Sequence, residues 1–151
     1  MSDAEFMRLA LAEAERAKSA GEVPAGAVMV NGGRVIASAH NRNILEFDPS
    51  AHAEVACLRD AGKQFRNHRL TGCTLFVTIE PCAMCAGALV HARIDRLVYG
   101  ASDPKAGAVH SVMQVLGHPS LNHRVEVTAG VLAEECSRML QQFFRERRTS
   151  K

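Results

Sequence analysis

Apolar residues recur at helical spacing in the first part of the chain. They repeat every three or four positions between Ser2 and Gly21, at Phe6, Leu9, Ala10, Ala14 and Ala17. This period predicts an amphipathic helix. Ser2 and Glu5 have the spacing of a capping box, so we expect the helix to begin there and to end at Gly21.

Two short apolar runs follow, over residues 25–30 and 34–40. The turn between them, Asn31-Gly32-Gly33, supplies positive φ angles at little cost, so the two runs predict a β-hairpin. After a loop over residues 41–50, Ser50 is expected to cap a helix over residues 51–61. Gly62 is expected to end that helix.

Strands and helices alternate through the rest of the chain. Strands are predicted over residues 74–79, 96–99 and 124–129. Helices are predicted over residues 81–92, with Pro81 in the first position, and over residues 112–116 and 132–148. A hairpin followed by this alternation predicts an α/β fold, a three-layer α/β/α sandwich around a mixed five-stranded sheet. Because no repeat or low-complexity linker divides the chain, residues 1–151 are expected to form one domain.

The composition excludes several classes of protein. With 47% apolar and 23% charged residues among 151, the chain is not intrinsically disordered. The chain contains no run of about 18 apolar residues, which is the length that a helix needs to cross a bilayer. The N-terminus is acidic, whereas a secretory signal begins with basic residues. We therefore expect a cytoplasmic protein with no membrane partner.

Charge is unevenly distributed along the chain. Residues 1–60 carry six Lys or Arg against nine Asp or Glu, whereas residues 61–151 carry twelve against seven. The first part therefore has a net charge of −3 and the second a net charge of +5, which together give the +2 of the whole chain. The basic part suits an anionic partner, but an offset of this size does not identify one.

Cysteine spacing indicates a metal site. Five cysteines are an odd number for a disulfide framework, and two of them stand as Cys82-x-x-Cys85. Pro81 and Cys82 open one predicted helix, and His52-Ala53-Glu54 opens another, with 29 residues between His52 and Cys82. Free N–H groups and the dipole at a helix N-terminus stabilise a thiolate, which is the form that binds metal.

One imidazole and two thiolates favour zinc. His52, Cys82 and Cys85 give three protein ligands, and three ligands with an open fourth position are typical of catalytic zinc sites. Zinc would acidify a water molecule in that position, and Glu54 is placed to carry protons rather than to bind metal. The alternative is a closed structural site, in which a further cysteine completes the ligand set: Cys57, Cys73 or Cys136. Each of these three is expected to pack in the core or to be inert.

Nearly the whole chain, from about Glu5 to Arg148, resembles the bacterial tRNA adenosine deaminase family. The H-x-E and P-C-x-x-C pair is the signature of zinc deaminases. The resemblance extends to Glu22–Val28, Asn41-Arg42, Asp48–Glu54, Glu80–Ala88, Asp103–Ala108, Leu121–Val127 and Phe143–Arg148. It implies a cytidine-deaminase-like fold, one Zn²⁺ per subunit, and a homodimer whose partner helps to build the RNA site. It also implies an activity, the hydrolysis of adenosine to inosine at the wobble position of a tRNA anticodon loop.

The resemblance assigns roles to individual residues. His52, Cys82 and Cys85 would hold zinc, and Glu54 would be the proton shuttle. Zinc-bound hydroxide would attack C6 of the purine while Glu54 delivers protons to N1 and to the departing ammonia. Substrate contacts would come from Asn41, Ala53, Asp103, Lys105, Asn122, His123 and Arg145.

Three further features bear on the RNA site. The basic residues Arg145, Arg147, Arg148 and Lys151 would contact phosphates, with Phe143 or Phe144 packing or stacking beside them. Without the resemblance, these residues are typical of a solvated helix end. His110 departs from the family pattern, which generally has a small residue there. Glu80 either orients the site through its carbonyl or only joins a strand to a helix, and we expect its side chain to do no more than the latter.

Two other functions remain open. A deaminase of free bases or nucleosides, of the guanine or cytosine type, would need the same zinc and glutamate but no basic surface. A zinc-stabilised RNA-binding module without catalysis would hold its metal with four protein ligands. Its RNA affinity would not depend on Glu54.

Overall fold

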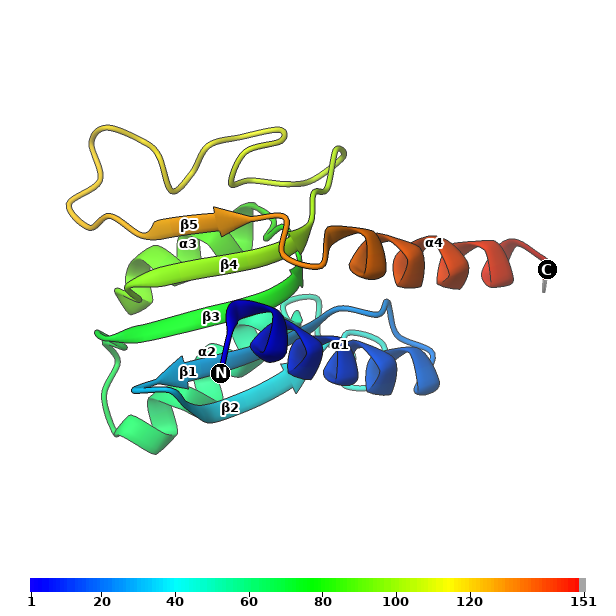
Figure 1. Ribbon diagram of the computed structural model, residues 1–151, viewed down its shortest axis with the longest axis horizontal. Helices are drawn as coiled ribbons and strands as arrows, with labels where there is room; N and C mark the ends of the chain where they lie inside the picture. Colours follow the sequence, from blue (N-terminus) through cyan, green and yellow to red (C-terminus); the bar gives the residue numbers. More distant parts are fainter. Residues whose placement is uncertain (150–151) are drawn as a thin grey trace.

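One mixed five-stranded sheet forms the centre of the computed structural model, which describes residues 1–149 (Figure 1). The strands are β1 (Gly26–Asn31), β2 (Arg34–His40), β3 (Cys73–Ile79), β4 (Arg96–Ala101) and β5 (Glu126–Ala129). The helices are α1 (Asp3–Ser19), α2 (Ala53–Phe65), α3 (Ala83–Ala92) and α4 (Ala133–Thr149). The predicted α/β sandwich is confirmed.

The strand order across the sheet is β2-β1-β3-β4-β5, and β1 is the one strand that runs opposite to the other four. The hairpin strands β1 and β2 are antiparallel, and β1 is also antiparallel to β3. The strands β3, β4 and β5 run parallel to one another. Parallel neighbours need crossover connections, which α3 and the long segment after β4 provide.

Alternate residues of each central strand face opposite layers of the sandwich. Leu75 and Val77 of β3 pack in the core cluster that contains residues of α2 and α3. Between them, Phe76 points to the other face, where it packs with residues of α1 and α4. Figure 1 shows α1 and α4 together on the near face, with α2 and α3 behind the sheet. The period-two pattern therefore gives both faces of the sheet an apolar cover.

The strand pairing brings several chain segments to one edge of the sheet. Ile79 pairs with Ala101, so β3 and β4 both end at this edge. Gly26 pairs with His40, so β2 also ends where β1 begins. The loops that follow β2, β3 and β4 consequently meet there.

Several predicted element ends differ from the structure. The Ser2–Glu5 capping box is confirmed, and Ser2 is the N-cap of α1. The prediction that Ser50 caps α2 is wrong, because His52 is the N-cap and Ser50 instead donates hydrogen bonds to Asp48. Gly62 does not end α2 either. The helix continues to Phe65, because packing against the sheet outweighs the small helix penalty of one glycine.

Pro81 is not in the first position of α3. The helix begins at Ala83 with Cys82 as its N-cap, so Pro81 lies just outside it. There the Pro81 carbonyl accepts a hydrogen bond from the backbone N–H of Ala108, 2.8 Å away. Strand β4 extends to Ala101, two residues beyond the prediction.

The predicted helix over residues 112–116 is absent. Within the described chain this stretch consists of turns and irregular backbone. The N–H groups of Val112 and Met113 donate to the carbonyl of Gly107, which winds the chain back over the preceding loop. These bonds to a neighbouring loop replace the helical pattern that the apolar residues suggested.

None of the helices within residues 1–149 combines the length and apolar character that a membrane span requires.

Candidate active site

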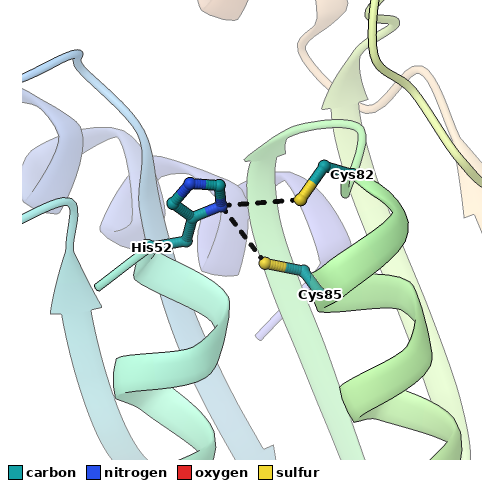
Figure 2. A group of neighbouring side chains, drawn as sticks. All are labelled: His52, Cys82 and Cys85. Carbon is teal, nitrogen blue, oxygen red and sulfur yellow. Dashed lines mark hydrogen bonds between the residues drawn. The ribbon is translucent and has the colours of Figure 1, made fainter. Parts of the chain in front are cut away.

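Three potential metal ligands converge where the N-termini of α2 and α3 meet. Nδ1 of His52 lies 3.6 Å from Sγ of Cys82 and 3.4 Å from Sγ of Cys85. Figure 2 shows the imidazole facing the two sulfurs across the space between the helices. The ligand atoms lie within 4.8 Å of one another, and no fourth His, Cys, Asp or Glu within residues 1–149 joins the group.

These distances fit a zinc ion. A nitrogen at about 2.0 Å and a sulfur at about 2.3 Å from one tetrahedral centre lie roughly 3.5 Å apart. The observed separations of 3.4 and 3.6 Å match that geometry. A set of three protein ligands suits an open, catalytic coordination rather than a closed structural one.

The surroundings favour a thiolate at Cys82. Hydrogen bonding with Cys85 and His52 lowers the pKa of Cys82 to about 3, although partial burial opposes the shift. The pKa of Cys85 is raised, because its thiol is paired with the Cys82 thiolate and is itself buried. The pKa of His52 is also raised, chiefly by the hydrogen bond with Cys82. Cys82 and Cys85 together therefore hold a negative charge where a cation would bind.

Glu54 lies beside this group in the first turn of α2. Its side chain is 3% exposed, and burial raises the pKa of its carboxyl to about 7, with His52 and Cys85 opposing the shift. A carboxyl group with this pKa can both accept and donate a proton near neutrality. It is not a member of the ligand group.

Asn41 and Ala53 are joined at the same edge. Asn41 directly follows β2 and is buried, and its Oδ1 accepts a hydrogen bond from the N–H of Ala53, 2.8 Å away. Ala53 is the first residue of α2 and is fully buried. Both predicted substrate residues therefore lie at the site, and the amide oxygen of Asn41 is already engaged in capping α2.

The side chain of Glu80 has a larger role than we expected. It is 2% exposed, and its Oε2 accepts hydrogen bonds from the N–H groups of Val109, His110 and Ser111 at 3.1, 2.8 and 2.9 Å. Its Oε1 accepts from the N–H of Asp103 at 3.1 Å and from the Ser111 hydroxyl. Burial opposes ionisation, but these bonds prevail and lower the pKa of Glu80 to about 2. The expectation that this side chain only joins a strand to a helix is wrong.

Glu22 holds the loop that follows β2 in the same way. It is 2% exposed, and its carboxylate accepts hydrogen bonds from the N–H groups of Ile44 and Leu45 at 3.1 and 2.8 Å. The sequence analysis gave Glu22 no role, and it gave the side chain of Glu80 none beyond joining a strand to a helix. The available signal was a single acid next to an apolar segment, before it at Glu22 and after it at Glu80.

Asp103 and Lys105 lie on the loop that Glu80 holds. Oδ1 of Asp103 accepts hydrogen bonds from the N–H groups of Lys105 and Ala106, which closes a tight turn. The Lys105 side chain is exposed. His110, on the same loop, lies with its Nδ1 2.7 Å from the hydroxyl of Tyr99, whose side chain is buried. The large residue at position 110 is thus accommodated by a partner in β4.

Asn122 and His123 lie at the opposite edge of the sheet. The segment after β4 starts beside the site and crosses to the start of β5, as Figure 1 shows. His123 contacts the carbonyl of Ile94, just before β4, with its Nε2 2.6 Å away. Both residues border a cavity of about 380 Å³ at the C-terminal end of α3. The ten residues of α3 separate this end from Cys82 by about 15 Å, so the structure does not bring Asn122 or His123 to the site.

The basic end of α4 extends beyond the sheet on the side where β4 ends (Figure 1). Arg145 and Arg148 border a surface cavity with Phe144, which is 45% exposed. Phe143 is buried, and the guanidinium of Arg147 lies over its ring and donates to the carbonyl of Gly21. The predicted contact at Lys151 lies outside the described residues.

The other three cysteines are buried away from the ligand group. Cys57 donates to the carbonyl of Ala37, and burial raises the pKa of its thiol. Cys73 lies in the same core cluster, and Cys136 lies in the cluster on the other face of the sheet. Within the described chain none of them lies close enough to be a fourth ligand of the group.

Comparisons with known proteins agree on the family. Residues 1–148 match the MafB19-like deaminase family. The chain is 50% identical over 150 residues to the tRNA-specific adenosine deaminase of Haemophilus influenzae. The alignment covers 99% of this chain and 87% of the relative. The chain belongs to the tRNA-specific adenosine deaminase family. The resemblance inferred from the sequence is confirmed.

Solved structures give the same result. A structure from studies of A-to-I editing by tRNA:A34 deaminases superposes with a TM-score of 0.87 at 47% identity, over 90% of this chain and 99% of the other. A guanine deaminase from Bacillus subtilis is less similar, with a TM-score of 0.66 at 30% identity over 97% of this chain and 95% of the other. The chain is therefore more similar to the tRNA deaminases than to this free-base enzyme.

Proposed function

We propose that this protein hydrolyses adenosine to inosine and ammonia at the wobble position of a tRNA anticodon loop. The observation that carries the proposal is the ligand group of His52, Cys82 and Cys85 with the buried Glu54 beside it. The similarity of the whole chain to tRNA-specific adenosine deaminases supports the choice of substrate.

His52, Cys82 and Cys85 would hold one zinc ion per subunit. When bound, zinc lowers the pKa of a water molecule from about 15.7 to about 7 and so supplies a nucleophile at neutral pH. Glu54 would take a proton from this water and deliver it to N1 of the adenine. It would then take the proton of the new C6 hydroxyl group and pass it to the departing amino group, so that the C6 carbonyl forms as ammonia leaves and water and adenosine become inosine and ammonia.

Other residues of this edge would bind the substrate. The Nδ2 group of Asn41 makes no hydrogen bond within residues 1–149, so it is available to the base. The loop of Asp103 and Lys105 would border the ribose and its phosphates. Arg145, on the projecting helix α4, would contact the RNA backbone farther from the base. An unpaired anticodon loop suits such a site, because extracting its base costs less than extracting one from a duplex.

Asn122 and His123 need a different account. Because they lie about 15 Å from the ligand group, they would contact RNA only outside the reacting base. The cavity beside them is bordered by His68, Arg69, His91 and Arg93 and by no acidic residue, which suits a phosphate backbone.

We also propose a homodimer of single-domain subunits that acts in the cytoplasm. An apolar groove of about 700 Å³ between α2 and α3, lined in part by Val55, Leu58, Leu70 and Ala88, supports a second copy as its occupant. Light scattering should give twice the mass of one chain, and Leu58→Glu should yield monomers. A monomeric wild-type protein would contradict this part of the proposal.

The substrate proposal is tested with purified zinc-loaded protein. A pool of tRNA is sequenced before and after incubation, because inosine reads as guanosine and reports both the reaction and its position. Free adenosine, guanine and cytosine are incubated in parallel, and ammonia is measured. Conversion at the wobble position alone is the expected result. Turnover of a free base with no change in tRNA would favour the free-base deaminase, and RNA binding without any turnover would favour a binding module.

A further inference from the structure

A buried carboxylate ties the substrate loop to the segment that carries the zinc ligands. Glu80 directly follows β3 and stands two residues before Cys82. Each of its oxygens accepts at least two of the five hydrogen bonds that come from residues 103–111. The next residue, Pro81, accepts a sixth bond from this loop through its carbonyl. Glu80 and Pro81, just before α3, thus organise the loop over residues 103–111.

Only a carboxylate satisfies this arrangement. All five groups around the side chain are donors, so glutamine would place an amide NH₂ against at least one of them. An aspartate would be one methylene too short to reach the same groups. A buried N–H without an acceptor costs free energy, so the loop would move rather than keep its present path.

The loop also approaches Glu80 too closely for any side chain at position 107. A Cβ atom added to Gly107 would lie 2.4 Å from Cδ and Oε1 of Glu80. The backbone of Gly107 therefore packs directly against the carboxylate. Such close contact fixes the position of the loop as well as its hydrogen bonding.

We propose that Glu80 is a positioning residue for the deamination reaction. Its carboxylate fixes Asp103 and Lys105 relative to the helix that bears Cys82 and Cys85, so that the RNA-facing loop is ordered before the substrate arrives. This inference rests on the proposed function. An ordered loop costs less conformational entropy when RNA binds, so Glu80 acts on substrate affinity and not on the metal.

The test compares Glu80→Gln with wild-type protein on an anticodon stem-loop that contains the target adenosine. Loss of bonds to a charged acceptor should raise KM about 10- to 100-fold, with a smaller change in kcat. Zinc content, measured by elemental mass spectrometry, should stay at the wild-type value. Amide exchange at Val109, His110 and Ser111 should become faster, while exchange in β3 and β4 should not change.

Asp3→Asn is the matched control for lost stability. Asp3 forms an ion pair with Arg96 at the opposite edge of the sheet, with Nη2 and Oδ2 2.6 Å apart. This variant also loses a carboxylate that accepts hydrogen bonds, but it leaves the loop intact. Its KM should therefore stay within about twofold of the wild-type value at a temperature where both proteins are folded.

Two milder variants keep the inference testable if Glu80→Gln does not fold. Ser111→Ala removes one of the five donors and should raise KM severalfold, and Gly107→Ala should raise KM further by displacing the loop. Three results would each overturn the inference: an unchanged KM in all of these variants, unchanged amide exchange in the loop, or loss of zinc from folded Glu80→Gln. If wild-type protein does not convert the stem-loop, the proposed function fails, whereas amide exchange still tests the loop.

Discussion

The side-chain oxygen of Asn41 accepts a hydrogen bond from the backbone N–H of Ala53, 2.8 Å away. This contact joins the end of β2 to the first turn of α2, and it falls between His52 and Glu54 in the sequence. One of the free N–H groups at the helix N-terminus is thereby satisfied from another strand. The placement of His52 and of Glu54 therefore depends on a residue that stands at least eleven positions before both in the sequence.

Two variants of Asn41 separate its capping role from a role in substrate binding. Asn41→Ala should lower the free energy of unfolding by about 1 kcal/mol and also reduce activity. Asn41→Asp keeps an acceptor for Ala53 but loses the NH₂ donor, so its stability should stay near the wild-type value while activity falls. Urea denaturation and initial rates on a stem-loop measure the two effects. Equal destabilisation by both variants would contradict the capping role.

Replacement of Glu54 should abolish proton transfer without removing the metal. Glu54→Gln should lower kcat about 10²- to 10⁴-fold, because general acid–base catalysis typically contributes that factor. Zinc content and RNA affinity should remain near wild type. A variant as active as the wild type would show that another group carries the protons.

Removal of zinc should reduce activity and stability together. A chelator should stop deamination and lower the unfolding temperature, because the bound metal stabilises the folded state, and added Zn²⁺ should restore both. Cys82→Ser should bind zinc poorly. Cys73→Ala is the control, because Cys73 is buried and does not belong to the ligand group. This variant should retain one zinc ion per chain. A metal-stripped sample that keeps full activity would contradict a catalytic metal.

The Asp3–Arg96 pair should contribute stability only above acidic pH. The hydrogen bond from Arg96 lowers the pKa of Asp3 in the folded state. Its contribution is therefore present above the unfolded pKa of about 3.9 and is lost as pH falls through the lower folded value. Asp3→Asn should be less stable than wild type at pH 7, and the difference should shrink as the pH falls below the unfolded value of about 3.9. A difference that persists in acid would show that the pair acts through packing.

Arg145 should contribute to RNA binding through charge alone. Arg145→Ala should weaken stem-loop binding at low salt and reduce the magnitude of the salt slope by about one. Arg34→Ala provides the control, because Arg34 is also exposed but begins β2, next to the hairpin turn at the other edge of the sheet. Equal effects of the two substitutions would indicate a general effect of net charge.

The sequence predicted elements whose signals are local. The capping box at Ser2 and the glycine turn of the hairpin each depend on a few neighbouring residues, and the structure contains both. The predicted alternation of strands and helices is also present, except for the helix over residues 112–116. The H-x-E and C-x-x-C spacings likewise place their residues at helix ends, where the structure brings His52, Cys82 and Cys85 together.

Features that depend on distant contacts were not predictable. The acceptor role of Glu80 needs donors from about 30 positions away, and no periodicity announces them. Residues 112–116 are apolar at helical spacing, but bonds to Gly107 and Ala108 determine their path. The position of Asn122 and His123 follows from the crossing of the sheet by the segment after β4, which short motifs do not encode.

The hairpin turn at Gly32 and Gly33 points away from the edge that holds His52. Both glycines have positive φ angles and open space around their α-carbons. A fluorophore or a fused binding domain could be attached at this turn without touching the ligand group or Glu54. Such a derivative would allow the enzyme to be immobilised or followed in single-molecule work while its RNA face stays accessible.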